Sequence, residues 1–199
     1  MKAWPLVIAL LLAGCGSVPP RTADVDAQPA WEARQLALAR QSEWTLNGRL
    51  SLTLDETSWH ASLRWRQRGD DYEIRIFGPF GRAVALIEGG PDDVLLRTAE
   101  GEEFRATDAD ELLRRELGWP LPVAGLRYWV LGLAQPPLAQ ARVELADGGR
   151  PLRLFQDGWT IDYQRYSEPP AAGLPDRMLL TRETVSLRLL VDEWRLPDV

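Results

Sequence analysis

The side chains that could perform chemistry in this sequence are few and far apart. His60 is the only histidine and Cys15 is the only cysteine among 199 residues. A Ser-His-Asp or Cys-His system would have to use His60, which falls on the polar side of an alternating segment. The sequence contains neither a cluster of His and Cys residues nor the spacing of an EF-hand, so it does not predict a metal site. These residues predict neither a metal centre nor a cofactor.

The acidic residues include three adjacent pairs, Asp70-Asp71, Asp92-Asp93 and Glu102-Glu103. Two carboxylates can act as general acid and base. Each pair lies at or beside an expected turn, however, where solvated carboxylates are ordinary. No glycine-rich phosphate-binding loop lies between a strand and a helix. We therefore expect that the chain is not an enzyme. Its net charge of -6 argues against nucleic acid or anionic headgroups as the main partner.

One connection between expected strands is unusually apolar. Gly78-Pro79-Phe80-Gly81 places a phenylalanine where polar residues are the norm. Pro79 suits the second position of a type I turn, so Phe80 would lie at or near the tip. An exposed phenylalanine forgoes roughly 1.5 to 3 kcal/mol of burial. Either the loop folds back to hide Phe80, or Phe80 meets something apolar outside the protein, and the sequence leaves both open.

Most of the remaining chain alternates apolar and polar residues with the period of two that is typical of strands. Short connections rich in Gly and Asp predict hairpins between neighbouring strands, and therefore antiparallel meanders. The expected strands occupy residues 44–54, 59–66, 72–77, 82–87, 94–98, 102–106, 141–145, 152–155, 159–166, 177–181 and 185–191.

Three segments have helical character instead. Residues 31–43 consist of helix formers without glycine or proline. Residues 109–117 follow a capping-box-like start and end at Gly118. A further helix begins at Pro122 and ends before Gly132. The last two helices are amphipathic, so each needs an apolar surface to cover.

These elements predict a fold that is mainly β with some α. We expect an open, unclosed antiparallel half-barrel of about eleven strands, with helices lidding its concave face. Such an arrangement encloses apolar space.

The N-terminus has the pattern of an export signal. Lys2 precedes an apolar run from Leu6 to Ala13, which is shorter than the roughly 20 residues needed to cross a bilayer. The segment that ends in Gly14-Cys15 resembles a lipobox. We therefore expect a signal peptide over residues 1–14 and lipidation of Cys15.

The expected organisation of the mature chain follows from composition. Residues 15–30 are small, polar and proline-bearing, which predicts a lipidated flexible tether. Residues 31–199 form a single domain.

Taken in order, these segments resemble the LolB family of outer-membrane lipoprotein receptors, which accept lipoproteins from the soluble periplasmic carrier LolA. The resemblance spans nearly all of the mature chain and implies the same lidded half-barrel. It rests on the lipobox, the helix near Trp31, Leu63-x-Trp65, Gly78-Pro79-Phe80-Gly81, residues 126–132, Trp159-x-Ile161-x-Tyr163-x-x-Tyr166, and Leu187-Arg188-Leu189 with Trp194.

The resemblance also implies a role for the apolar loop and a location. In the family, a protruding loop with an exposed apolar residue, usually leucine, is implicated in delivering lipoproteins to the membrane, and Phe80 matches that position. Gly78 stands where asparagine is common, but the loop keeps its hydrophobicity, so Gly78, Pro79, Phe80 and Gly81 are expected to form a membrane-insertion loop. Gly16 replaces the aspartate that retains lipoproteins in the inner membrane, which implies the periplasmic face of the outer membrane.

A cavity for the acyl chains of lipoproteins is expected between the helices and the sheet. The resemblance implies that the protein's partners are LolA, the acyl chains of lipoproteins and outer-membrane lipid. It also implies that the protein acts as a monomer. Each expected lining residue could instead belong to an ordinary core; the set is Leu52, Leu63, Trp65, Ile74, Ile76, Leu112, Leu126, Trp129 and Val130. The main alternative is a non-transport scaffold lipoprotein in envelope assembly, which a filled core without ligand space would favour.

Overall fold

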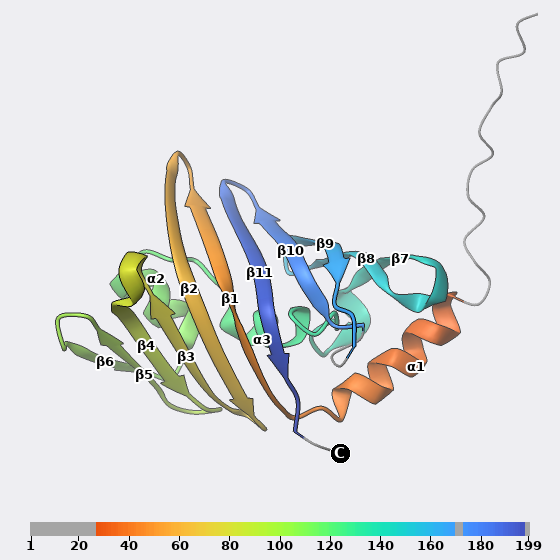
Figure 1. Cartoon of the computed structure of the whole chain (residues 1–199), viewed down its shortest axis with the longest axis horizontal. Coiled ribbons are helices and arrows are strands. Elements are labelled where there is room, and N and C mark those ends of the chain that lie inside the picture. The colour runs from red at the N-terminus through yellow and green to blue at the C-terminus, as the bar shows by residue number, and fades with distance from the viewer. Residues whose placement is uncertain (1–26, 170–172, 198–199) are drawn as a thin grey trace, which may run out of the picture.

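The structure of the protein, a computed structural model, describes residues 27–169 and 173–197. Within these residues, eleven strands form one antiparallel sheet in the order β6-β5-β4-β3-β2-β1-β11-β10-β9-β8-β7. The sheet consists of two meanders, β1 to β6 and β7 to β11, which join where β1 pairs with β11. Figure 1 shows that the sheet stays open, with β6 and β7 at opposite ends.

The elements follow one another with short connections. The first meander contains β1 (Glu43–Leu54), β2 (Thr57–Arg68), β3 (Asp71–Phe77), β4 (Ala83–Gly89), β5 (Val94–Thr98) and β6 (Glu103–Ala106). The second contains β7 (Arg142–Leu145), β8 (Pro151–Gln156), β9 (Trp159–Tyr166), β10 (Pro175–Arg182) and β11 (Val185–Arg195). Helix α1 (Ala27–Ala39) precedes both meanders, and helices α2 (Ala109–Leu117) and α3 (Val123–Trp129) connect them. Short 3₁₀ turns lie at η1 (Pro79–Gly81), η2 (Leu138–Gln140) and η3 (Asp147–Gly149).

One face of the sheet forms the core because apolar residues occupy alternate positions on the central strands. Leu46 and Leu52 of β1 are fully buried, whereas Arg49 is exposed on the other face. Trp44 packs between Trp65 of β2 and Trp194 of β11, with ring centroids 5.3 and 5.6 Å apart. These aromatic contacts join three strands at the junction of the two meanders.

Helices α2 and α3 cover the inner face of the sheet (Figure 1). The Asp108 carboxylate accepts a hydrogen bond of 2.8 Å from the backbone nitrogen of Glu111 and so caps α2. Gly118 ends α2 in the left-handed conformation, with φ of 69°. Both helices lie where the sequence predicts them. We call α2, α3 and the connecting residues 118–122 the lid.

Helix α1 begins earlier than the sequence predicts. It spans Ala27–Ala39 rather than residues 31–43, so the last four residues of the expected tether are helical. Pro29 is tolerated because backbone N–H groups in the first turn have no partner within the helix. The buried Trp31 then packs against η3, where a Cβ on Gly149 would lie 2.4 Å from the Trp31 backbone nitrogen. Such tertiary contacts, which helix propensity does not reveal, set the position of α1.

The predicted fold class is confirmed, since an unclosed antiparallel sheet of eleven strands carries helices over its concave face. The expected signal peptide (1–14), Cys15, and the tether as far as residue 26 lie outside the described residues. Across residues 27–169 and 173–197, no helix combines the length and apolar character needed to span a membrane.

Candidate functional site

An apolar cavity of about 50 Å³ lies between the lid and the inner face of the sheet. No polar side chain lines it. The lining residues are Leu50, Leu63, Trp65, Ile74, Ile76, Ile87, Leu113, Trp119, Leu121, Val123, Leu126, Val130, Leu187 and Leu189. The sheet and the lid therefore both contribute to one apolar space.

The structure brings together six of the nine residues expected at this cavity, namely Leu63, Trp65, Ile74, Ile76, Leu126 and Val130. The other three, Leu52, Leu112 and Trp129, are fully buried but lie elsewhere in the core. Trp129 packs against Trp159 at 6.2 Å and donates its indole N–H to Gln156 at 3.0 Å. Leu52, Leu112 and Trp129 do not line the cavity in this structure, because burial alone does not say which neighbours a side chain meets. The contact of the nine residues with acyl chains stays a prediction.

Sequence reasoning missed several lining residues. Leu187 and Leu189 alternate along β11 and pair across from β1, so the strand pattern could have placed them on the same inner face. Trp119 and Leu121 follow the C-cap of α2, and their periodicity gives no signal because they belong to no regular element.

The cavity is small for a lipid ligand. Pockets that hold drug-sized ligands measure about 300 to 1,000 Å³. The present volume of about 50 Å³ is far below that range. In this structure the space between the lid and the sheet is therefore too small for a long acyl chain.

A few polar contacts hold the lid. The backbone nitrogen of Val123 in α3 donates to the Asp110 carboxylate of α2 at 2.7 Å. Burial raises the pKa of Asp110, and the hydrogen bond from Val123 only partly opposes this effect. Arg127 of α3 donates to Asp70, which lies in the turn between β2 and β3, at 2.8 Å. Because Asp70 is exposed, this ion pair contributes little to stability.

The C-terminal end of the lid is fixed more firmly. Gln156 of β8 is buried; its side chain accepts hydrogen bonds from Trp129 Nε1 and the backbone nitrogen of Gln135, and it donates to the Gln135 carbonyl at 2.6 Å. Tyr163 donates its hydroxyl to the Trp129 carbonyl at 3.0 Å. Buried hydrogen bonds of this kind are costly to break. The end of α3 near Trp129 is therefore better anchored than its start.

The apolar loop projects fully into solvent. Phe80 is 102% exposed, so the loop does not fold back to hide it. Gly81 donates its backbone N–H to the Gly78 carbonyl at 3.1 Å, and Phe80 has φ of 71° and ψ of 15°. These values match the third position of a type II turn rather than the type I turn that Pro79 suggested. A phenylalanine in this left-handed conformation is strained, and such strain is found mainly at functional sites.

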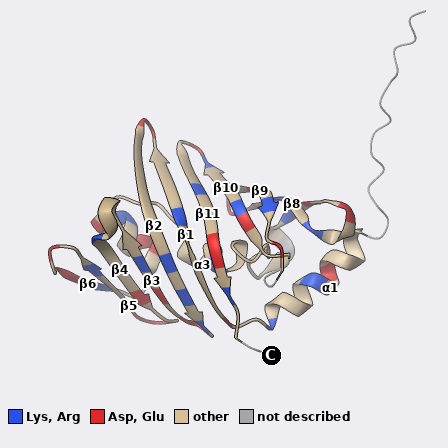
Figure 2. Ribbon diagram, viewed as in Figure 1, with Lys and Arg blue, Asp and Glu red and all other residues tan. Residues whose placement is uncertain are grey.

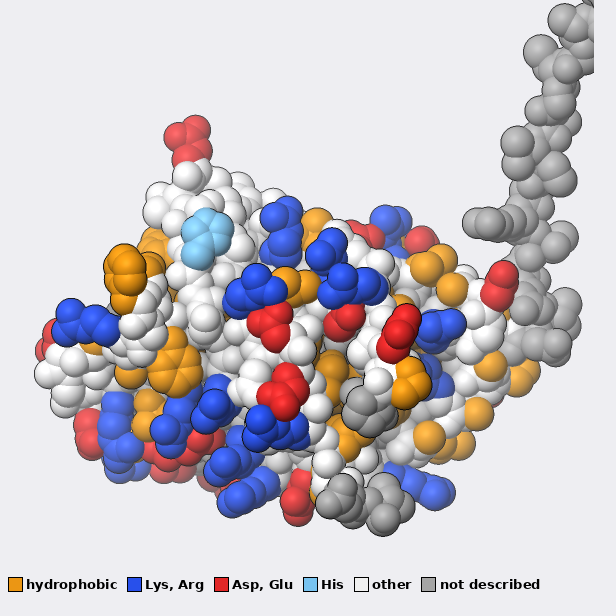
Figure 3. Space-filling model, viewed as in Figure 1, with side chains coloured by type: hydrophobic (Ala, Val, Ile, Leu, Met, Phe, Trp, Pro, Cys, Tyr) orange, Lys and Arg blue, Asp and Glu red, His pale blue; other side chains and the backbone are white. Residues whose placement is uncertain are grey.

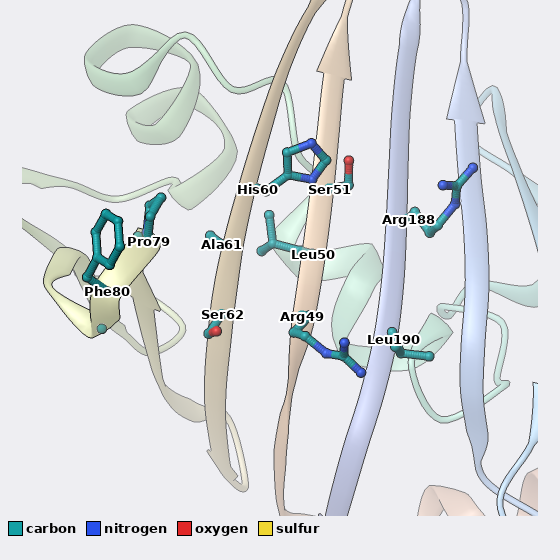
Figure 4. Close-up of a pocket in the computed structure, with 12 residues that line it drawn as sticks. Arg49, Leu50, Ser51, His60, Ala61, Ser62, Pro79, Phe80, Arg188 and Leu190 are labelled. Carbon is teal, nitrogen blue, oxygen red and sulfur yellow. The ribbon is translucent and has the colours of Figure 1, made fainter.

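A groove of about 600 Å³ begins at this loop and crosses the outer face of the sheet. Figure 4 shows Pro79 and Phe80 on one side, His60 and Ser51 in the middle and Arg188 on the far side. His60 is exposed, and within residues 27–169 and 173–197 it forms no hydrogen bond with a nucleophilic side chain.

The remaining acidic candidates lie at turns and strand ends, as the sequence predicts. Asp93 pairs with Arg105 at 3.3 Å and Glu103 pairs with Arg97 at 2.6 Å. Charges of both signs are spread over the strands (Figure 2). In the part of the chain that the structure describes, no group of three or more His, Cys, Asp or Glu side chains could hold a metal ion.

Comparisons with known proteins point to one family. The family model described as "Outer membrane lipoprotein LolB" matches residues 42–194. A protein named outer-membrane lipoprotein LolB from Nitrosococcus oceani is 41% identical over 191 residues, which cover 96% of this chain and 95% of that protein. Its namesake from Chromohalobacter salexigens is 37% identical over 191 residues, covering 96% of this chain and 88% of that protein.

A solved structure shares the fold. A LolA superfamily protein from Nitrosomonas europaea superimposes with a TM-score of 0.53 and 12% identity, covering 87% of this chain and 94% of that one. The low identity limits this similarity to the architecture, an open sheet with helices on its inner face.

Proposed function

The chain belongs to the LolB family of outer membrane lipoproteins, and from this premise we propose that it accepts lipoproteins from a periplasmic carrier and inserts them into the outer membrane. Its anchor would be a lipid on Cys15, which places the domain on the periplasmic face. The observation that carries the proposal is the pairing of a wholly apolar cavity with a fully exposed Phe80.

The energetics explain why such a receptor needs a cavity. Burying each CH₂ group contributes about 0.8 kcal/mol, so moving one long acyl chain through water costs on the order of 10 kcal/mol. Transfer from one apolar cavity into another buries as much surface as it exposes. The step then proceeds without nucleotide, provided that the acceptor binds slightly better.

Entry of the acyl chains requires the lid to open. The sheet is held together by backbone hydrogen bonds along eleven strands. Apart from the contacts at Trp129, α3 is held to α2 by backbone hydrogen bonds to Asp110, and to the sheet by the ion pair of Arg127, in its last turn, with the exposed Asp70. The lid is therefore the part that moves, with its hinge at the better anchored end near Trp129. The side chains of Leu126 and Val130 would then contact the acyl chain.

Phe80 would contact the outer membrane during release. A fully exposed phenylalanine gains burial free energy only by entering an apolar phase. In a transfer assay, Phe80→Glu should leave acceptance from the carrier intact and strongly reduce insertion of a labelled lipoprotein into vesicles. Leu36→Glu, which places the same charge at an exposed apolar residue on α1, is the control and should insert normally. Unchanged insertion by Phe80→Glu would contradict the role of the loop.

A scaffold lipoprotein of envelope assembly is the second candidate, because the cavity volume of about 50 Å³ is that of a nearly filled core. The two candidates differ in ligand binding. A fluorescent long-chain fatty acid should bind the full-length protein if the lid opens. Failure of this probe to bind would favour the scaffold.

A further inference from the structure

The groove beside Phe80 contains a row of hydrogen-bond donors on the outer face of the sheet. His60 of β2 lies directly opposite Ser51 of β1, and Ser51 lies opposite Arg188 of β11. Directly paired residues on one face are neighbours, so the imidazole, the hydroxyl and the guanidinium form a continuous line. The line spans two strand spacings, or about 10 Å.

Arginines surround the end of this row. Leu190 of β11 pairs with Arg49 of β1 on one side and Arg177 of β10 on the other, and Arg188 lies two residues away on the same face. We call Arg49, Arg177 and Arg188 the arginine patch. Figure 3 shows arginine side chains on this face of the molecule, with carboxylates among them.

Although the whole chain carries a net charge of -6, the arginine patch locally has more positive than negative charge. Arg49 forms a two-point contact with Asp192, at 2.6 and 3.0 Å. The neighbouring Asp162 is already bound by Arg153 at 2.5 Å. Within the described residues, Arg177 and Arg188 have no ion pair, and both are exposed. Exposed guanidinium groups without carboxylate partners bind phosphate well.

We propose that this groove binds the phosphate groups of membrane phospholipids, so that the outer face of β1, β2 and β11 lies against the membrane when Phe80 enters it. Arg188 is the principal contact and Ser51 supplies a hydroxyl beside it. The proposal rests on the proposed function, since it assumes that Phe80 reaches the membrane. Phe80 borders the groove, and its insertion brings the groove to the level of the headgroups.

The test measures contact of the groove with lipid. The full lipidated protein is reconstituted into vesicles of phosphatidylcholine, with or without an equal part of phosphatidylglycerol. A nitroxide is attached at Ser62→Cys, which lines the groove, and its accessibility to lipid-soluble and water-soluble relaxation agents is recorded. We expect lipid contact that is stronger with phosphatidylglycerol and weakens with salt.

Charge variants make the test specific. Arg188→Gln should reduce the docked fraction on anionic vesicles about fivefold, as expected for one arginine near such a surface. Arg40→Gln removes the same charge from an exposed site just after α1, outside the groove and the lid, and should have no effect. Equal thermal unfolding of both variants would exclude misfolding as the cause.

The outcomes separate this proposal from the one on which it rests. Loss of insertion by Phe80→Glu, together with unchanged lipid contact in Arg188→Gln, overturns the phosphate groove and leaves the proposed function standing. Normal insertion by Phe80→Glu contradicts the role of the loop, on which this proposal rests. Failure of the unaltered protein to insert the labelled lipoprotein overturns the proposed function itself. If Arg188→Gln slows acceptance from the carrier while lipid contact stays the same, the arginine patch docks a protein and the proposal is wrong.

Discussion

Two unfavourable features coincide at Phe80. The side chain is fully exposed, and the backbone adopts a left-handed conformation that β-carbon-bearing residues avoid. Neither feature helps the protein to fold. The exposure and the strained backbone together hold the ring of Phe80 away from the sheet. A contact with an apolar phase outside the protein would require this position.

A stability measurement can separate folding from function at this position. Phe80→Asn should raise the free energy of unfolding by about 1 kcal/mol, because asparagine tolerates the left-handed conformation and no buried surface is lost. Phe80→Leu keeps the strain and should leave stability unchanged. Urea unfolding monitored by circular dichroism measures both. A less stable Phe80→Asn protein would contradict the strain argument.

The residues of the loop predicted that Phe80 lies at a turn, but they left its exposure open and did not predict its backbone conformation. The position of Phe80 between two strands indicated a tip, but proline at the second position of a turn suits types I and II equally. Type II normally requires glycine or asparagine at the third position, so a phenylalanine there gave no signal for it. Only the three-dimensional structure identifies the turn.

At the scale of elements, the strands follow the alternation of the sequence closely, because one face of each central strand meets the core and the other meets solvent. The lid was harder to predict in detail. Leu112 and Leu113 are adjacent on α2 and both are buried, yet only Leu113 lines the cavity. The rotation of a helix on a sheet depends on packing, which the helical pattern does not specify.

Protonation of one carboxyl couples the lid to pH. Burial raises the pKa of Asp110 above its ordinary value of 3.8, so the folded protein holds this proton more tightly than the unfolded chain. The resulting stabilisation is complete below pH 3.8 and is lost as the pH rises through the folded pKa. Asp110→Asn, which stays neutral, should therefore be more stable than the original protein at pH 7.

The two proteins should converge in acid. Unfolding free energies measured from pH 3 to pH 7 should show a smaller decline with rising pH for Asp110→Asn. The exposed Asp92→Asn is the control and should follow the original protein. A parallel pH dependence for Asp110→Asn would show that this carboxyl does not titrate in the way its burial indicates.

At the scale of the whole molecule, the near absence of free volume links stability to ligand binding. Leu126 lines the cavity and Leu112 does not, although both are buried leucines of the lid. Replacing either with alanine should lower the free energy of unfolding by about 2 to 5 kcal/mol. Only Leu126→Ala adds space where an acyl chain would lie, so it alone should bind the fatty acid probe more tightly.

Probe titrations on both variants, alongside urea unfolding, check this prediction. Equal probe affinity in Leu126→Ala and Leu112→Ala would mean that the acyl chain binds elsewhere or not at all.

The overall architecture was predictable because hairpin spacing and alternation recur along the entire polypeptide. The cavity volume was not, because it is a small difference between the space enclosed by the elements and the side chains that fill it.

The unclosed sheet leaves β6 and β7 as outermost strands, with no further strand of the described chain beside them. Exposed strand edges are templates for aggregation. Each of these two is only four residues long and carries charges of both signs, Glu103 and Arg105 on β6 and Arg142 and Glu144 on β7. Short, charged edges pair poorly with other extended chains. The sheet can thus remain unclosed without inviting fibril growth or strand exchange between neighbouring molecules.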